Sequence, residues 1–374
     1  MATTPALDVG IVGATGLVGR EFLALLERRR FPIRRLRLLA SERSAGSRIE
    51  FGGEEITVEA LAGADPAGLD LVLFSAGKEV ARAEAPRFAA AGALVVDNSS
   101  AFREDPDVPL VVPEINAAEL ATRPVKGIVA NPNCSTIMLI LPVAALERAF
   151  GVEEIVVSTY QSVSGAGQAA VDELFGQARA FARGEAETWQ HYDRPIFLNL
   201  IPKVGELGAD GACLEEVKMV DETRRILGRA DLAVYATTVR VPVERCHSES
   251  VLVRLRWPVT LEDVTAALEG APGVELHELP TPRELARREA TYVGRIRVGE
   301  ADRRVVRFWV VGDQLWKGAA LNTIQIAETL IVQGMCTRRD AAGGSAATPG
   351  SSRGNAGDGI AGTPGSSRGN AGAG

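Results

Sequence analysis

One cysteine between small polar residues marks the first candidate chemical centre. In "NPNCST", Cys134 lies between the apolar runs "GIVA" and "IMLILPVAAL", where a strand would end and a helix would begin. The positive end of a helix dipole favours thiolate, which is the reactive form of cysteine. A buried or capping cysteine would fit this fragment equally well. The stretch therefore offers Cys134 as a candidate nucleophile that the rest of the chain must support.

A glycine-rich turn supplies a candidate cofactor site. "GATGLVG" (13–19) follows the short β-rich run "DVGIVGA" and opens the helical pattern "GLVGREFLALLERR". Glycines let a backbone approach a pyrophosphate, and a helix N-terminus supplies N–H donors. The spacing is GxxGxxG rather than the commoner GxGxxG, and a tight turn without a ligand is the alternative. Its place between strand and helix predicts dinucleotide binding.

The end of the second predicted strand indicates which dinucleotide binds. An NAD site usually has an acidic residue here for the ribose hydroxyls. In "LASERSAG", Ser41, Arg43 and Ser44 could hold a 2′-phosphate by charge-assisted hydrogen bonds, whereas an inward Glu42 would favour NAD. We therefore expect NADP. Beside a nicotinamide cofactor, a cysteine can form a thioester that a hydride then reduces to an aldehyde.

Thioester chemistry needs an acid/base and orienting donors, and two further stretches offer them. His247 in "CHSES" precedes a strong strand, and Arg240 ends the strand before it. "STYQSVSGAG" ends a strand at Gln161 and continues to Ser164 and Gly165 at a helix start, where donors could face an acyl oxygen. An isolated edge histidine would be structural or solvated. Because the candidate nucleophile Cys134 needs an acid/base, we expect His247 to be catalytic.

A third stretch, "LEEVKM", places Glu215 and Lys218 one helical turn apart on one face. As an exposed ion pair they would contribute little to stability. Near the cysteine they could bind a charged substrate.

The elements that must position these residues show two different secondary-structure patterns along the chain. Before residue 134, strand-like runs such as "LRLLA", "LDLVLFSA", "ALVVDNSS", "VPLVVPEIN" and "KGIVANPN" alternate with helical patterns, which predicts a parallel sheet covered on both faces. After Gly151, longer strands with few crossovers predict an α+β domain with a mostly antiparallel sheet. "WKGAALNTIQIAETLIVQGM" is expected to form one long helix.

The composition of the chain restricts the classes of protein to which it can belong. The chain has 374 residues, 46% hydrophobic and 24% charged, with a net charge of -7. This suits a soluble two-domain protein and does not favour nucleic acid binding. No apolar run reaches the roughly 20 residues that cross a bilayer, and no leader-like segment precedes the first strand. The four cysteines are scattered without metal-ligand spacing, so we expect no metal and a reducing, cytoplasmic setting.

The C-terminal stretch differs from the rest of the chain. From residue 341 it is rich in glycine, serine and alanine, and "TPGSSRGNAG" occurs twice, from Thr348 and from Thr363. Such a segment buries too little apolar surface to offset chain entropy. We expect a disordered tail over 341–374.

The motifs together resemble the aspartate-β-semialdehyde dehydrogenase family. The resemblance rests on "GATGLVG", "ASERSAG", "DNSSAFR", "VPEIN", "NPNCST", "YQSVSGAG", "EEVKM", "VRVPV" with "CHSES", and "KGAALNTIQIAE", in this order from about residue 10 to residue 335. It implies a Rossmann-type NADP-binding domain (1–133 plus 318–340) and an α+β catalytic and dimerisation domain (134–317). It also implies NADPH-dependent reductive dephosphorylation of L-aspartyl-4-phosphate, on the route to lysine, methionine, threonine and diaminopimelate. The resemblance further implies a homodimer, with a tetramer as the alternative.

The resemblance also implies roles for single residues. Cys134 would be the nucleophile, His247 the acid/base and Gln161 the group that orients the acyl intermediate. Substrate and phosphate would be held by Arg240, Glu215, Arg103, Lys218 and Asn133. The cofactor site would include Gly13, Thr15, Gly16, Leu17, Val18, Ser41, Arg43, Ser44, Ser164, Gly165 and Asn322.

One segment departs from the family pattern, and rival functions stay open. In "GDQLWKGAALN", Gln314 and Trp316 stand where the family pattern has Asn and Arg, close to the expected nicotinamide side. N-acetyl-γ-glutamyl-phosphate reductase shares the expected fold and thioester chemistry but needs no carboxylate for a free ammonium. Glyceraldehyde-phosphate dehydrogenase is a weaker rival, because its cysteine context differs. A non-catalytic NADP-binding protein of the same fold is the alternative from another class.

Overall fold

The first part of the chain, residues 7–130, forms a seven-stranded sheet in the order β3-β4-β2-β1-β5-β6-β7. The computed structural model describes residues 6–336, so the tail predicted over 341–374 lies outside the described residues. All neighbouring strands in this sheet are parallel except β3 and β4. The strands are β1 (Leu7–Val12), β2 (Ile33–Ala40), β3 (Arg48–Phe51), β4 (Glu54–Ala60), β5 (Leu71–Phe74), β6 (Leu94–Asp97) and β7 (Ile128–Ala130).

Helices cover both faces of this sheet, as its apolar strands require. Helix α1 (Leu17–Arg28) packs on one face and helix α2 (Lys78–Ala90) packs on the other. The connections between strands include the short turns η1 (Glu42–Ser44), α3 (Pro113–Asn116) and η2 (Ala117–Leu120). Every residue of β1, β5 and β6 is buried.

The prediction of a strand over "VPLVVPEIN" was wrong: only Leu110 forms a bridge, to Ala130, and Pro113 then starts α3. Proline lacks the N–H that a ladder needs, but it fits the first turn of a helix.

The second sheet has six strands in the order β11-β12-β13-β10-β8-β9. Its central ladders are antiparallel, and the edge pairs β11–β12 and β8–β9 are parallel. The strands are β8 (Val152–Gln161), β9 (Ala233–Arg240), β10 (His247–Leu255), β11 (Val274–Leu276), β12 (Thr291–Val298) and β13 (Val305–Gly312). The expected mixed α/β fold with two sheets is confirmed, although neither β11 nor β12 was predicted from the sequence.

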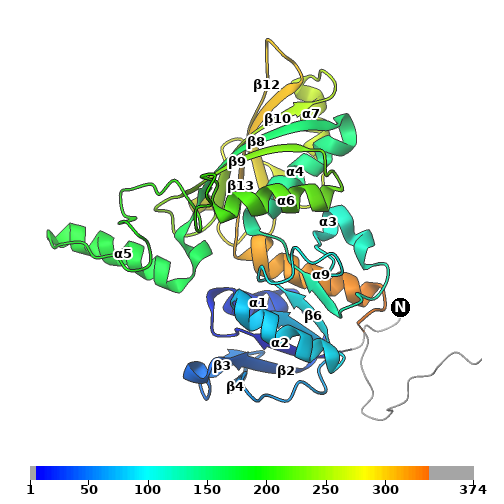
Figure 1. The fold of residues 1–374 in the computed structure, drawn as a ribbon, viewed down its shortest axis with the longest axis vertical. Coiled ribbons are helices and arrows are strands. Elements are labelled where there is room, and N and C mark those ends of the chain that lie inside the picture. Colours follow the sequence, from blue (N-terminus) through cyan, green and yellow to red (C-terminus); the bar gives the residue numbers. More distant parts are fainter. Residues whose placement is uncertain (1–5, 337–374) are drawn as a thin grey trace, which may run out of the picture. The chain divides into compact units, whose positions relative to one another are not determined.

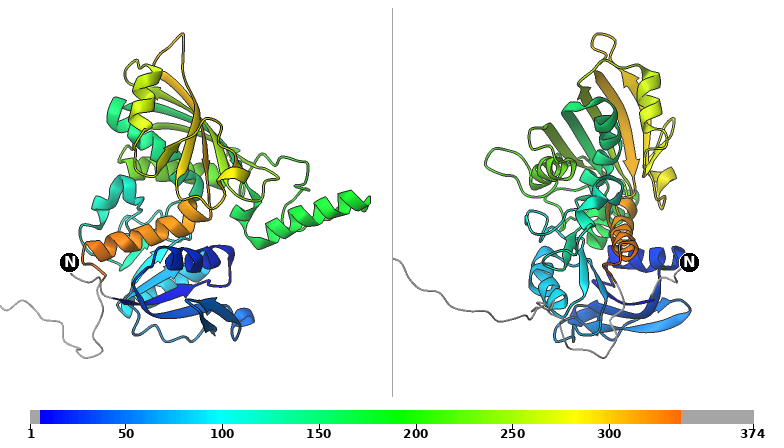
Figure 2. Two further views of the ribbon diagram at one scale, coloured as in Figure 1. Left: turned by 180° about the vertical axis from the view of Figure 1, so that it is seen from behind. Right: turned by 90° about the vertical axis from the view of Figure 1, so that its right-hand side faces the viewer.

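The helices of this half are α4 (Cys134–Phe150), η3 (Val163–Ala166), α5 (Gln168–Arg183), α6 (Leu214–Leu227), α7 (Leu261–Leu268) and α8 (Pro282–Leu285). In Figures 1 and 2, α5 extends away from both sheets, whereas α4 and α6 lie against the second sheet.

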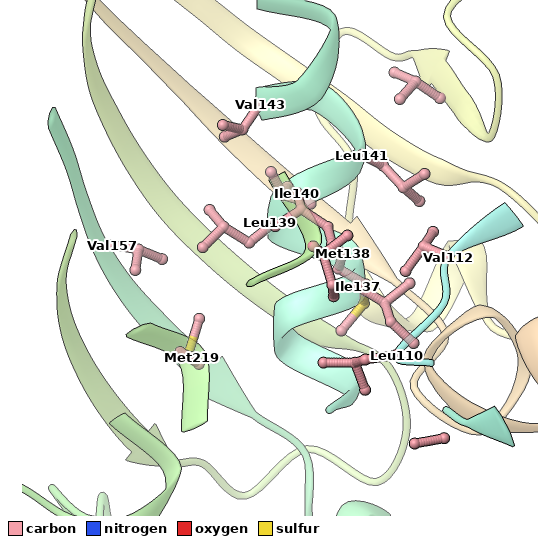
Figure 3. Packing of buried hydrophobic residues seen from close by; sticks show 14 of the residues in the cluster. Leu110, Val112, Ile137, Met138, Leu139, Ile140, Leu141, Val143, Val157 and Met219 are labelled. Carbon is pink, nitrogen blue, oxygen red and sulfur yellow. The ribbon is translucent and has the colours of Figure 1, made fainter. Parts of the chain in front are cut away.

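The start of α4 is buried between the two halves. Its residues from Ser135 to Leu146 are all buried, as expected for a helix that is apolar all round. Figure 3 shows Leu139 and Val157 on one side of this helix and Leu110 and Val112 on the other. These residues belong to one continuous apolar cluster that includes strands of both sheets. The first turn of α4 is therefore held firmly from both sides.

The long C-terminal helix begins with a π-helical turn. Residues Trp316–Ala320 form this turn (η4), and α9 (Leu321–Val332) continues it, so the long helix predicted from the sequence is confirmed. Its apolar side packs with β1 and α1 in a second apolar cluster. A π-helical turn inside an α-helix often marks a functional site. Within residues 6–336, no helix has both the length and the apolar character needed to cross a membrane.

Candidate active site

Cys134 is the first residue of α4, as the sequence predicted. The side-chain oxygen of Asn133 caps the helix by accepting the N–H groups of Ser135 at 3.0 Å and Thr136 at 3.1 Å. Behind the cysteine lies the π-helical turn, where a Cβ on Gly318 would come within 2.7 Å of the Cys134 Cβ. Only glycine at position 318 leaves room for this approach.

The resting form of Cys134 is the thiol. Burial raises the pKa of Cys134 to about 12, and the Glu215 carboxylate contributes in the same direction. Arg103, Arg240 and the N–H of Ser135 oppose this rise without overcoming it. The thiolate that the helix dipole alone would favour therefore requires a base that removes the proton.

Glu215 binds to the residue that caps the cysteine helix. The Asn133 side-chain N–H donates to Glu215 Oε1 at 2.8 Å. Gln161 donates to Ser135 Oγ at 2.8 Å and, at 3.4 Å, to the same Glu215 oxygen. Lys218 Nζ lies 3.4 Å from Glu215 Oε2. Asn133 thus keeps one side-chain hydrogen for a substrate, because its oxygen and its other hydrogen are engaged by the protein.

Glu222 was not predicted from the sequence, yet it connects two site residues. Its carboxylate accepts the backbone N–H of Asn133 at 2.5 Å and a guanidinium N–H of Arg103 at 3.1 Å. Burial raises the pKa of Glu222, and the Arg103 charge opposes that rise. "EEVKMVDE" carried the signal: Glu222 is seven residues after Glu215, so both lie on one face of α6.

His247 is buried and faces the same cleft. Its Nδ1 accepts the backbone N–H of Ser162 at 3.0 Å, and the Ser162 hydroxyl lies at the same distance. Its Nε2 has no hydrogen-bond partner among residues 6–336. Burial, together with the Arg240 charge, keeps the pKa of His247 well below its usual value, so the ring is neutral at neutral pH.

Arg240 ends β9 beside the histidine. Its Nη1 donates to the Ser162 carbonyl at 2.6 Å, and Gly165 approaches both side chains. A Cβ on Gly165 would lie 3.1 Å from His247 Nε2 and 3.3 Å from Arg240 Nη1. The guanidinium keeps further N–H donors that can form a bidentate pair with a carboxylate.

These residues share one cleft of about 380 Å³, a volume that suits a small ligand. Its lining includes most of the predicted catalytic, substrate and cofactor residues: Gly16, Leu17, Val18, Arg103, Asn133, Cys134, Gln161, Ser164, Gly165, Glu215, Lys218, Arg240 and His247. It also includes residues that sequence reasoning missed, among them Ser75, Asn98 and Ser100. These three follow β5 and β6, and the carboxyl ends of parallel strands are where ligands bind in such sheets.

The glycine turn fits a dinucleotide. Gly13 has a φ of +84°, and a Cβ there would collide with the Ser75 carbonyl, so the turn requires glycine. Gly16 precedes α1, and no side chain among the described residues caps this helix. Its first N–H groups are therefore free for a pyrophosphate.

The predicted 2′-phosphate residues lie next to this turn. Thr15 Oγ1 donates to Ser44 Oγ at 3.3 Å, which brings the end of β2 against the glycine turn. Ser41 and Arg43 are exposed there, and so is Glu42. The exposed Arg43 guanidinium is free to meet an anion at this edge.

Asn322 does not line the cleft, contrary to the prediction. It is fully buried, and its amide donates to the Val111 carbonyl and to Asn131 Oδ1. Its oxygen accepts from the buried Lys317 ammonium at 2.8 Å. Its motif lies on α9, and the side chain points into a polar network between segments rather than toward a ligand.

Gln314 and Trp316, which depart from the family pattern, point in different directions. Gln314 lines the cleft, donates to Ser164 Oγ at 2.6 Å and accepts the backbone N–H of Cys246. Trp316 is buried against α1, where its indole N–H donates to Glu21 at 2.5 Å. Only Gln314 can therefore touch a bound ligand directly.

This geometry defines a class of enzyme. A dinucleotide-binding turn, a cysteine on a helix start and a buried neutral histidine meet in one cleft, as an oxidoreductase that forms a covalent acyl intermediate requires. No group of three or more His, Cys, Asp or Glu residues within 6–336 is placed to hold a metal ion.

Comparison with known proteins identifies the family. Residues 8–123 match the semialdehyde dehydrogenase NAD binding domain, and residues 143–317 match the semialdehyde dehydrogenase dimerisation domain. Aspartate-semialdehyde dehydrogenase of Aquifex aeolicus is 44% identical over 335 residues, covering 87% of this chain and 98% of the relative. The chain belongs to the aspartate-semialdehyde dehydrogenase family of oxidoreductases.

Solved structures agree with this assignment. Aspartate semialdehyde dehydrogenase II from Vibrio cholerae, complexed with ASA, superposes with a TM-score of 0.85 at 41% identity, over 87% of this chain and 98% of that chain. The Candida albicans enzyme with NADP gives a TM-score of 0.70 at 25% identity, over 88% of this chain and 99% of that chain.

Proposed function

We propose that this protein reduces L-aspartyl-4-phosphate to L-aspartate-4-semialdehyde with NADPH, releasing phosphate through a thioester on Cys134. One observation carries the proposal: Cys134, His247, Arg240 and Glu215 line the same cleft as the glycine turn. The fit of the glycine turn to a pyrophosphate and the exposed Arg43 support NADP as the cofactor. The product would serve the synthesis of lysine, methionine, threonine and diaminopimelate in the cytoplasm.

The substrate would be held at both ends by charges. The free N–H donors of Arg240 match the α-carboxylate, and the buried Glu215 carboxylate matches the α-ammonium. An N-acetylated substrate has no ammonium, so it would leave Glu215 with Lys218, at 3.4 Å, as its cationic partner. A buried carboxylate with one cation is less well compensated than one with two, which favours aspartyl phosphate over the N-acetyl-glutamyl analogue.

The first chemical step forms the thioester. His247 Nε2 removes the proton from Cys134, and the sulfur attacks the acyl carbon. The acyl C–O bond to the phosphate then breaks, and phosphate leaves with that oxygen toward Arg103 and Lys218. Asn133 holds the acyl group through its remaining side-chain hydrogen, and Gln161 orients the group by exchanging its long 3.4 Å contact with Glu215 for one with the acyl oxygen.

The second step releases the aldehyde. Gly16, Leu17 and Val18 would hold NADPH, which would supply the hydride for reduction of the thioester carbonyl. His247, which carries the proton taken from Cys134, then lies beside the developing oxyanion and protonates it. Collapse of the resulting hemithioacetal breaks the C–S bond, and the proton returns through His247 to the Cys134 sulfur.

We further propose a homodimer that associates through the second sheet, and a tetramer would add contacts beyond this face. Tyr235, Tyr160 and Val156 expose large apolar side chains on one face of β8 and β9, with Tyr235 60% exposed. Apolar patches of this kind mark association surfaces. The matched dimerisation domain covers the same strands. We also propose the domain division 1–133 plus 318–340 and 134–317.

A side-by-side assay tests the function. Purified protein with NADP⁺ and phosphate should form NADPH from aspartate semialdehyde much faster than from N-acetyl-glutamate semialdehyde. Omitting phosphate should stop NADPH formation. Equal rates with the two aldehydes, or activity without phosphate, would refute the proposal. A protein that binds NADP but turns over neither aldehyde would instead be the non-catalytic alternative.

A further inference from the structure

Two polar atoms of Ser162 contact the same nitrogen of His247. The backbone N–H and the side-chain hydroxyl both lie 3.0 Å from His247 Nδ1. Both residues are fully buried, so water does not compete for this nitrogen. The two groups differ in what they can do: a backbone N–H can only donate, whereas a hydroxyl can donate or accept.

This difference bears on which ring nitrogen carries the hydrogen. While Nδ1 accepts from the Ser162 N–H, the neutral ring must carry its hydrogen on Nε2, the nitrogen that faces the cleft. That form can donate to a ligand but cannot take a proton from Cys134. A ring that acts as a base at Nε2 must carry its hydrogen on Nδ1, and Nδ1–H needs an acceptor in this dry site.

We propose that Ser162 is a positioning residue whose hydroxyl oxygen accepts the Nδ1–H of His247 and so makes the base form of the ring available. The proposal rests on the proposed function, since it assigns His247 the proton of Cys134. In the transfer the S–H bond breaks, an Nε2–H bond forms, and the hydrogen on Nδ1 stays in its bond to Ser162 Oγ. The ring is then an imidazolium with one N–H toward Ser162 and the other toward the substrate.

Ser162 also fixes the neighbouring cation. Its carbonyl accepts from Arg240 Nη1 at 2.6 Å, so one residue orients both the base and the arginine. The charged and titratable groups that share the cleft with the ring are Arg103, Cys134, Glu215, Lys218 and Arg240. Glu249 lies on the same strand, and Asp313 follows β13, where it pairs with Arg245. Ser162→Ala alters none of these charges and leaves the backbone contacts to the ring and to Arg240 in place.

Nitrogen NMR of the imidazole rings tests the proposal without using activity. The chain has only three histidines, so the signal of His247 can be assigned by its absence in His247→Asn. At neutral pH we expect the wild-type ring to exchange between the form whose Nδ1 accepts from the Ser162 N–H and the form whose Nδ1–H donates to the Ser162 hydroxyl. Ser162→Ala should leave only the first form, which moves the averaged His247 Nδ1 resonance toward that of an unprotonated acceptor. Ser164→Ala is the matched control: it removes a nearby hydroxyl that contacts Gln314 and the Glu244 carbonyl instead, and it should leave the resonance in place.

Kinetics provides the second readout. We expect Ser162→Ala to lower kcat roughly tenfold, as for the loss of one hydrogen bond. The acidic limb of its kcat/KM profile should move to lower pH, because the imidazolium loses an acceptor. Unchanged Nδ1 resonances, or a lower kcat with an unmoved acidic limb, would overturn the proposal. Wild-type protein without dehydrogenase activity would instead refute the proposed function, while the NMR comparison would still decide the role of Ser162.

Discussion

The Glu222 carboxylate accepts the backbone N–H of Asn133 at 2.5 Å, immediately before the cysteine that opens α4. Its other oxygen accepts from Arg103 at 3.1 Å. The same side chain therefore fixes the start of the nucleophile helix and a cation that we assign to the phosphate group. Glu222 touches neither substrate nor cofactor in this account, so it acts by holding both groups in place.

Glu222→Gln should impair phosphate use more than it impairs folding. The amide keeps the shape of the side chain but loses the charge that holds Arg103, so small misplacements should lower the rate. We expect the KM for phosphate to rise and kcat to fall, each by about tenfold, consistent with the loss of a charged hydrogen bond. Asp221→Asn, an exposed neighbour on α6, serves as the control in steady-state assays and should change neither constant. A Glu222→Gln enzyme with wild-type constants would remove Glu222 from this role.

Lys317→Met should destabilise the protein strongly. Lys317 is 1% exposed, and its three ammonium hydrogens are shared by Glu114 at 2.7 Å, Asn322 at 2.8 Å and Gln325 at 2.7 Å. Removing one partner of a buried pair leaves the other charge uncompensated, at a cost of about 3–5 kcal/mol. Urea unfolding measures this loss. Adding Glu114→Gln to Lys317→Met should recover part of the lost free energy of unfolding. A loss below about 1 kcal/mol in Lys317→Met alone would show that the pair does not stabilise the fold.

Glu249→Gln should change how stability depends on pH. Glu249 is fully buried, and neither carboxylate oxygen has a partner among residues 6–336. Burial raises the pKa of Glu249 well above its usual value. Because this pKa is raised, the protonated Glu249 side chain contributes its full stabilisation of the folded protein below the unfolded-state pKa of about 4.3. This stabilisation is lost as pH rises above that value. The free energy of unfolding of the wild type should therefore fall, relative to that of Glu249→Gln, as pH rises above about 4.3.

The quantity to measure is the difference in free energy of unfolding between the wild type and Glu249→Gln. His247 makes the free energy of unfolding change with pH in the opposite direction. Its pKa is lowered by burial and by Arg240, so its stabilisation is lost as pH falls below about 6.5. His247 is present in both proteins and cancels in the difference. Parallel curves for wild type and Glu249→Gln would mean that Glu249 is ionised in the folded protein.

Arg43→Ala should weaken binding of NADP more than binding of NAD. Arg43 is exposed at the end of β2, beside the Thr15–Ser44 contact, and only NADP carries a 2′-phosphate. Loss of a charged hydrogen bond should reduce NADP affinity by about tenfold or more. Arg48→Ala, an exposed arginine on the edge strand β3, is the control for general loss of positive charge. Fluorescence titrations that show equal losses for both dinucleotides in Arg43→Ala would exclude this role.

The sequence predicted those parts of the fold that rest on local patterns. Alternating strands and helices, the glycine turn and the helix start at Cys134 all have signals within a few residues. The strand over "VPLVVPEIN" was mispredicted because Pro113 lacks the N–H that a ladder requires. β12 escaped prediction because its residues Thr291–Val298 mix apolar and charged side chains, and its partners lie elsewhere in the chain.

The site was predictable where motifs carry it and not where distant residues meet. Cys134, Gln161, Arg240 and His247 were named from the sequence, and the structure brings them to one cleft. The contact of Ser162 with His247 joins residues 85 positions apart, and that of Glu222 with Asn133 spans 89 positions. Helical spacing can place Glu222 on the same face of α6 as Glu215, but no local pattern encodes which distant residue it contacts. The motif of Asn322 shows its helix but not the direction of its side chain, which lies in a buried polar network.

The most direct test of the thioester on Cys134 is to trap the acyl enzyme. Incubating the protein with L-aspartyl-4-phosphate and no NADPH should give an aspartyl adduct, visible by mass spectrometry on the peptide that contains Cys134. Adding NADPH should discharge it as aldehyde, and Cys134→Ser should show neither adduct nor turnover while still binding NADP. An adduct on Cys213, Cys246 or Cys336 instead, or turnover that survives Cys134→Ser, would contradict the thioester on Cys134.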